Sequence, residues 1–215
     1  MRVLLIDHGC CDHPHTRVHG LRAGLAALGI EAAVCGPSSV PGLEEQPPGM
    51  YGIHLHDVAA ASRAFLAAVK DGTPRAFLAA TASVPARLLG LTRETARQMI
   101  AEAVDVLYPD AIFVLHAGIL TDLAVETGAP VVVHVTGDDL AAARDRPSLR
   151  NLVAAAIGSC AIVVADDETT ATTLAAEWLH EAPDAVDRAQ TWPLGPDAAT
   201  RIAIACRLAR RRPGG

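Results

Sequence analysis

Two kinds of segment alternate along the chain. Short, nearly uninterrupted apolar runs alternate with longer segments in which apolar residues recur every three or four positions. The first kind predicts strands that are buried on both faces, and the second predicts amphipathic helices. The predicted strands are residues 2–6, 31–35, 50–55, 111–115, 130–135 and 161–165. The predicted helices are residues 16–28, 58–69, 92–107, 119–126, 137–143, 149–157, 168–179 and 197–211.

Turn-forming residues mark several borders between these elements. Gly29 closes the first helix, and Gly36-Pro37 is expected to stop the second strand. Asp57 is expected to cap the helix that follows the third strand. Residues 41–49 are rich in Pro and Gly and predict a loop, whereas residues 75–80 fit a strand or a helix equally well.

The alternation of strands and helices predicts one α/β domain over residues 1–215. We expect a Rossmann-like parallel sheet with helices on both faces, ending in a C-terminal helix and basic tail at residues 196–215. Hydrophobic residues make up 51% of the chain and aromatic residues only 3%, so this core has to be built from aliphatic side chains. No apolar stretch reaches the roughly 18–20 residues that a bilayer requires, so no membrane span is expected.

Charge and cysteine usage narrow the function classes. A net charge of −6 gives no electrostatic reason to expect nucleic acid as a partner. The five cysteines are odd in number and Cys10 adjoins Cys11, which makes a disulfide framework improbable. With no secretory leader after Met1, the expected location is the cytoplasm.

Polar residues gather where the predicted strands end. In an open parallel sheet the ligand binds outside the carboxyl ends of the strands. All of the nine histidines except His180 fall at such ends, or in the loop and first helical turn after the first strand. The candidate site residues at this edge are Asp7, His8, Gly9, His13, His15, His54, His56, His116, His134, Thr136, Gly137, Asp138 and Asp139. We therefore expect a histidine-rich cleft here.

Two chemistries could use such a cleft. His13 and His15, and likewise His54 and His56, have the His-x-His spacing that directs two imidazoles to one side of an extended backbone. Neutral imidazole is the commonest metal ligand, so these four residues are candidates to hold a divalent metal such as Zn²⁺. The other chemistry is proton transfer by histidines on a sugar-like ligand whose hydroxyls the aspartates accept.

Several segments carry a resemblance to a known family. Residues 109–116 (PDAIFVLH) and 129–140 (APVVVHVTGDDL) resemble a run of glycosyltransferase family four. Residues 160–166 (CAIVVAD) resemble the next strand of that family, and residues 192–195 (WPLG) resemble the exit from its N-terminal domain. The resemblance covers nearly the whole chain, but only the acceptor-side half of a two-domain GT-B enzyme.

This resemblance implies roles for particular residues. His116, His134 and Asp138 are the implied catalytic residues, with His116 beside the reacting centre. The substrate-binding candidates, drawn from the strand ends and the first loop as well as from this resemblance, are Asp7, His8, Gly9, His13, His15, Thr136, Gly137 and Asp139. The first loop departs from the family's glycine-rich turn, because His8-Gly9-Cys10-Cys11 leaves only Gly9 for a close backbone approach.

Three functions stay open at this point. The chain is the acceptor-side half of a glycosyltransferase that acts on a sugar or nucleotide-sugar with a separate donor-binding subunit or as a homodimer. Alternatively, it is a single-domain hydrolase, lyase or isomerase that uses the histidine cleft, with or without a metal. The third is a non-catalytic binding module descended from a transferase.

Overall fold

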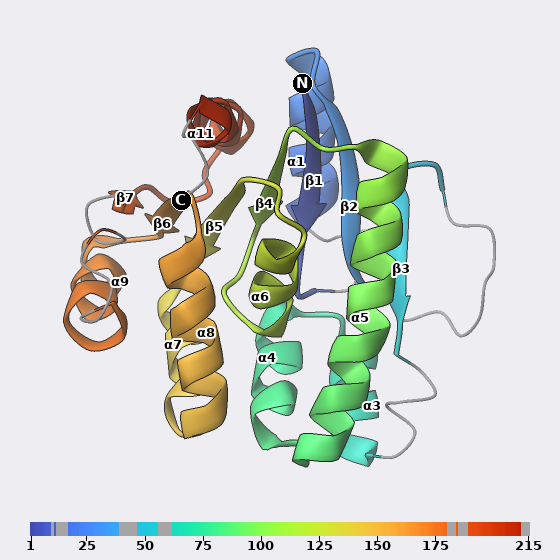
Figure 1. Ribbon diagram of the computed structural model, residues 1–215, viewed down its shortest axis with the longest axis vertical. Coiled ribbons are helices and arrows are strands. Elements are labelled where there is room, and N and C mark those ends of the chain that lie inside the picture. The colour runs from blue at the N-terminus through green and yellow to red at the C-terminus, as the bar shows by residue number, and fades with distance from the viewer. Residues whose placement is uncertain are drawn as a thin grey trace.

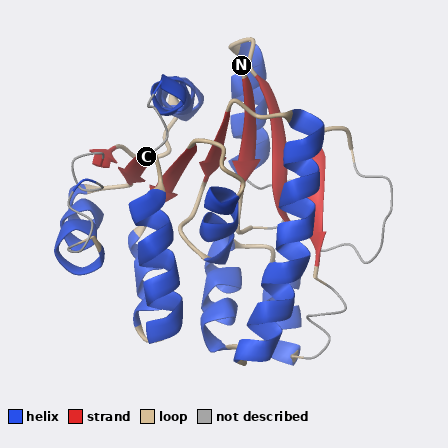
Figure 2. Ribbon diagram, in the orientation of Figure 1, coloured by secondary structure: helices blue, strands red, loops and turns tan. Residues whose placement is uncertain are grey.

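A seven-stranded parallel sheet forms the centre of the protein. The computed structural model describes residues 1–9, 11, 17–38, 47–55, 62–179, 184 and 189–211. The strand order is β3-β2-β1-β4-β5-β6-β7, and helices cover both faces (Figure 1; Figure 2). The strands are β1 (Arg2–Ile6), β2 (Glu31–Ser38), β3 (Met50–His54), β4 (Ala111–Val114), β5 (Val131–Val135), β6 (Ile162–Ala165) and β7 (Ala189–Thr191). The predicted α/β class and parallel sheet are confirmed.

The helices lie between the strands in sequence. They are α1 (Arg17–Ala27), α3 (Arg63–Asp71), α4 (Pro74–Ser83), α5 (Ala86–Leu107), α6 (Ile119–Glu126), α7 (Gly137–Arg144), α8 (Pro147–Ser159), α9 (Glu168–Thr173) and α11 (Ala198–Arg211). A single π-helical turn, η1 (Leu174–Trp178), continues α9. No helix of the described part is both long and apolar enough to cross a membrane.

Alternating side chains of the central strands feed two cores. On β5, Val131, Val133 and Val135 join the cluster under α5, α6 and α8, whereas Val132 joins the cluster under α1 and α11. Every residue of β4 and β5 is buried. Burial on both faces explains why these strands are uninterrupted apolar runs in the sequence.

The second strand does not stop where the sequence suggested. β2 continues through Gly36 and Pro37 to Ser38, and pairs with β3 along that stretch. A Cβ at position 36 would lie 2.7 Å from the backbone oxygen of Asp7 and 3.0 Å from that of Gly9. Glycine is therefore needed here for the close approach of β2 to the chain after β1, and not to end the strand.

Several predicted helix borders also change. The helix after β3 begins at Arg63, because the Ser62 side chain accepts a hydrogen bond from the Phe65 N–H as N-cap. The expected cap Asp57 lies outside the described residues. The ambiguous segment 75–80 belongs to helix α4, and α5 begins at Ala86 rather than at residue 92. The short edge strand β7 was not predicted.

Candidate functional site

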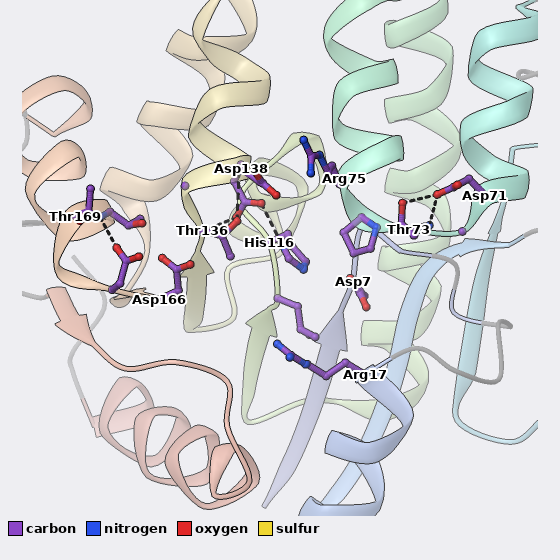
Figure 3. A pocket seen from close by; sticks show the side chains of 17 residues that line it. Asp7, Arg17, Asp71, Thr73, Arg75, His116, Thr136, Asp138, Asp166 and Thr169 are labelled. Carbon is purple, nitrogen blue, oxygen red and sulfur yellow. Dashed lines mark hydrogen bonds and ion pairs between the residues drawn. The ribbon is translucent and has the colours of Figure 1, made fainter.

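A cavity of about 840 Å³ lies at the carboxyl ends of β1, β4, β5 and β6. Its walls come from the residues that follow these strands, from the α3–α4 turn, and from the first residue of α1 (Figure 3). Asp7 follows β1, His116 follows β4, Thr136 and Asp138 follow β5, and Asp166 follows β6. The cavity is thus at the edge of the sheet where the strand-end rule places a ligand.

His116 and Asp139 form a hydrogen-bonded pair in the wall of this cavity. His116 Nδ1 lies 3.0 Å from Asp139 Oδ1. The other carboxylate oxygen, Oδ2, accepts hydrogen bonds from the backbone N–H groups of Ala117 at 3.0 Å and Thr136 at 2.9 Å. Because Asp139 accepts at both oxygens, we infer that His116 donates from Nδ1. The ring nitrogen that remains for a ligand is Nε2.

Two opposing effects set the protonation of His116. Burial by itself would lower its pKa, but the hydrogen bond and charge of Asp139, together with the charge of Asp7, raise the pKa above the ordinary value of 6.5. The nearby Arg17 guanidinium acts in the opposite direction, since its positive charge lowers the pKa. A raised pKa makes this imidazole a stronger base than an ordinary histidine.

Asp7 is a second buried acid at the same wall. Only 3% of Asp7 is exposed, and its Oδ1 accepts a hydrogen bond from the Gly9 N–H at 3.0 Å. Burial raises the pKa of this carboxyl, although the charge of His116 and the backbone hydrogen bonds oppose the rise. Asp7 therefore takes up a proton more readily than an exposed aspartate.

The side of the cavity formed by the chain after β5 and β6 carries further oxygen acceptors. The Thr136 side chain caps α7 by accepting from the Asp139 N–H, and Asp138 is exposed at the start of that helix. Asp166 lines the same side, and its Oδ1 is buried without a hydrogen-bond partner in the described part of the chain. Free carboxylate oxygens of this kind accept hydrogen bonds from ligand hydroxyls.

The opposite wall is the α3–α4 turn, which the sequence did not identify. Asp71 Oδ1 accepts hydrogen bonds from the backbone N–H and the hydroxyl of Thr73, and Thr73 in turn caps α4. Gly72 ends α3 with φ +75°, a conformation that favours glycine. Arg75, on the first turn of α4, completes this wall. The only sequence signal for this wall was the turn Asp-Gly-Thr-Pro, a pattern that indicates the border of a helix and does not by itself indicate a binding site.

His8 lies outside the cavity lining. It is fully buried, and its Nε2 accepts a hydrogen bond from the Leu120 N–H at 3.2 Å, at the start of α6. A Cβ at position 118 would come within 2.6 Å of that nitrogen, so Gly118 makes room for the imidazole. Burial and the charge of His116 lower the pKa of His8 to about 3. The neutral ring thus joins the end of β1 to α6.

His134 is also absent from the lining. It is 2% exposed and its ring lies against Trp192, with 6.0 Å between centroids. Trp192 belongs to the core under α1 and α11. Burial lowers the pKa of His134. Its implied catalytic role stays a prediction, and the structure places it beneath the cavity rather than in it.

The remaining histidines leave the metal hypothesis open. His54 ends β3, away from the lining residues, and His13, His15 and His56 lie outside the described residues. Within the described ranges, no group of three or more His, Cys, Asp or Glu side chains is placed to hold a metal ion. Of the described histidines, His116 alone lines the cavity, so the visible lining is richer in carboxylates than in imidazoles.

Comparisons with known proteins add information about the fold. No protein-family model and no curated protein matches the sequence significantly. Among solved structures, the chain is similar to a chain of sucrose-phosphate synthase from Thermosynechococcus elongatus, with a TM-score of 0.54 and 15% identity. The match covers 98% of both chains. It supports a glycosyltransferase-like α/β fold and, at this identity, the fold alone.

Proposed function

We propose that the cavity binds a sugar-like ligand and that the chain serves as the acceptor-side half of a GT-B glycosyltransferase. The observation that carries this proposal is the His116–Asp139 pair in the cavity wall, which leaves Nε2 of His116 for the ligand. The fold likeness and the position of the cavity at the strand ends support it.

In this proposal His116 acts as a general base toward a ligand hydroxyl. Its Nε2 takes the hydroxyl proton while the oxygen bonds to the anomeric carbon of the sugar donor, and the bond from that carbon to the nucleoside diphosphate breaks so that the diphosphate leaves with the electron pair. Asp139 stabilises the imidazolium that forms. The two backbone N–H groups on Asp139 Oδ2 hold the carboxylate in place for this role. Asp138 and Asp166 accept hydrogen bonds from other hydroxyls and so orient the ligand.

The donor would be held by a partner, either a separate donor-binding subunit or a second copy of this chain. The proposal therefore expects ligand binding, but no transfer, by the isolated chain. The pair His116–Asp139 is complete within one chain, which also favours the alternative of a single-domain hydrolase or isomerase acting on a sugar.

The test measures sugar binding and turnover separately. Isothermal titration with a panel of mono- and disaccharides should show that the wild type binds at least one sugar. His116→Gln should bind the same sugar with an affinity reduced about tenfold or more. His19→Gln is the matched control, because His19 is a partly exposed histidine on α1 outside the cavity lining. Absence of binding by the wild type would contradict the proposal.

Turnover decides between the two candidate functions. The isolated chain is incubated with UDP-glucose and the sugars that bind, and product is followed by mass spectrometry. No product is expected from the isolated chain. If the isolated chain hydrolyses or isomerises a sugar and His116→Gln abolishes that activity, the half-enzyme proposal is wrong and the chain is a single-domain enzyme.

A further inference from the structure

Two arginines line the cavity together with the aspartates. Arg17 is the first residue of α1, and Arg75 is the second residue of α4. Figure 3 shows them on opposite sides of the cavity with His116 between them. Because α1 and α4 are far apart in the sequence, the two arginines come together only in the folded chain, where both helices begin at this cavity.

Neither guanidinium has a hydrogen bond or a salt bridge to any described residue. Arginine forms strong bidentate pairs with carboxylates, and other arginines of this chain do so. Arg93 and Arg97, for example, pair with acids of α6, and Arg201 pairs with Asp197, which immediately precedes α11. Arg17 and Arg75 line a cavity with several aspartates and yet pair with none of the residues that the structure describes.

Three aspartates of the cavity accept hydrogen bonds from other groups. Asp71 accepts from Thr73, Asp139 from His116, and Asp167 from the Thr170 N–H. At least one oxygen of each of these three carboxylates thus holds the wall in place. The guanidinium groups of Arg17 and Arg75 are therefore available to a ligand that enters the cavity.

The positions of the two arginines do not favour the fold either. A cation in the first turn of a helix faces the positive end of the helix dipole, which is unfavourable. Neither α1 nor α4 has an acidic residue in its first turn to offset this charge. The helix dipole therefore does not favour a cation at either of these positions.

We propose that Arg17 and Arg75 bind an anionic group of the ligand. The ligand is then a hydroxylated molecule that carries a phosphate or a carboxylate, its hydroxyls facing Asp138 and Asp166. Arg17 is close enough to His116 for its charge to affect that imidazole, so the anionic group lies near the His116–Asp139 pair. This inference rests on the proposed function, since it specifies the ligand of the same cavity.

The test compares neutral and anionic probes in wild type and variants. Isothermal titration at low ionic strength is performed with glucose, glucose 6-phosphate, glucuronate and inorganic phosphate. The variants are Arg17→Gln and Arg75→Gln, with Arg87→Gln as the matched control. Arg87 is likewise the second residue of its helix, α5, and exposed, but lies outside the cavity lining.

We expect the wild type to bind at least one of the two anionic sugars about tenfold or more tightly than glucose, which corresponds to about 1.4 kcal/mol. Arg17→Gln and Arg75→Gln should each remove most of this preference, while Arg87→Gln has no effect. A preference for glucose 6-phosphate over glucuronate identifies a phosphate, and the reverse identifies a carboxylate.

The outcomes separate this inference from the proposed function. If glucose binds but no anionic probe binds more tightly, or if the preference survives both substitutions, the inference is wrong and the proposed function stands. If phosphate binds through the two arginines but no sugar binds, the proposed function is wrong and the anion site stands. A wild type that binds none of the four probes overturns the inference, and if it also binds no sugar of the panel above, the proposed function is wrong as well.

Thermal unfolding gives an independent readout. Because a cation in the first helical turn is unfavourable, the melting temperatures of Arg17→Gln and Arg75→Gln should equal or exceed that of the wild type. A clear fall would show that the guanidiniums hold the fold together and would overturn the inference.

Discussion

Replacing Asp139 by Asn tests the His116–Asp139 pair most sharply, because the change in shape is minimal. The Asn oxygen is needed by the two backbone N–H groups that now donate to Asp139 Oδ2. Its NH₂ group then faces His116 Nδ1, which has to become an acceptor. The ring proton moves to Nε2, and the carboxylate charge is lost.

The expected cost follows from the kind of hydrogen bond that is lost. A hydrogen bond to a charged group contributes about 1.5–3 kcal/mol, and a neutral one about 0.5–1.5 kcal/mol. The pKa of His116 is raised in the folded protein, so its protonation stabilises the fold fully below 6.5, the ordinary pKa. This stabilisation is lost as the pH rises through the raised pKa. The cost of Asp139→Asn should therefore be larger in acid.

A double-mutant cycle measures this coupling. Wild type, Asp139→Asn, His116→Gln and the double variant are unfolded in urea at about pH 5.5 and about pH 9. We expect a coupling free energy of about 1.5–3 kcal/mol at the lower pH and a smaller one at the higher pH. Equal coupling at the two pH values, or an Asn variant as stable as wild type in acid, would refute the reasoning.

Four further substitutions test other parts of the structure. The pKa of His8 is about 3 in the folded protein and 6.5 in an ordinary histidine, so the unfolded chain takes up a proton at a higher pH than the folded one. Urea unfolding should therefore show the free energy of unfolding of the wild type falling by up to about 5 kcal/mol between pH 6.5 and about 3. His8→Gln should remove this contribution to the pH dependence. Gly36→Ala forces a Cβ against the Asp7 carbonyl and should cost about 1–3 kcal/mol in the same assay. Gly20→Ala, in open space on α1, should instead stabilise by about 0.5–1 kcal/mol. Arg146 donates from one nitrogen to carbonyls at the end of α4, so Arg146→Met should lower the unfolding free energy by about 1.5–3 kcal/mol, and an unchanged value would contradict those contacts.

The sheet could be predicted from the sequence because its strands are buried on both faces. Uninterrupted apolar runs such as those of β4 and β5 are typical of parallel strands that helices cover on both faces. β7 escaped detection because a three-residue edge strand has too short a pattern to stand out. Gly36-Pro37 misled because the glycine serves a contact between strands, which only the packed sheet reveals.

The candidate site was predictable in part. The strand-end rule located Asp7, His116, Thr136 and Asp138, all of which line the cavity. His134 illustrates the limit of that rule, because it lies within β5 and its direction depends on the alternation of the strand. Successive side chains of a strand point to opposite faces, so His134 points to the same face as the core residue Val132. The predicted strand 130–135 therefore already indicated that His134 faces the core.

The remaining wall residues depend on packing that no local pattern records. Arg17 and the turn that carries Arg75 reach the cavity only because α1 and α4 begin beside the same strand ends. Asp139 was predicted to bind substrate, and its contact with His116 depends on the distance between β4 and β5 across the sheet. The place where α1 and α4 begin and the distance between β4 and β5 both depend on packing, and neither can be read from the spacing of residues along the chain.

The central claim is that His116 presents a basic Nε2 to a ligand in this cavity, and the tautomer and titration of that one ring test it most directly. Nitrogen-15 NMR of histidine-labelled protein, assigned with His116→Gln, should show the proton on Nδ1 above the pKa. Addition of a binding sugar should then shift the Nε2 resonance. A neutral ring protonated at Nε2, or a Nε2 resonance that no binding sugar moves, would contradict the account.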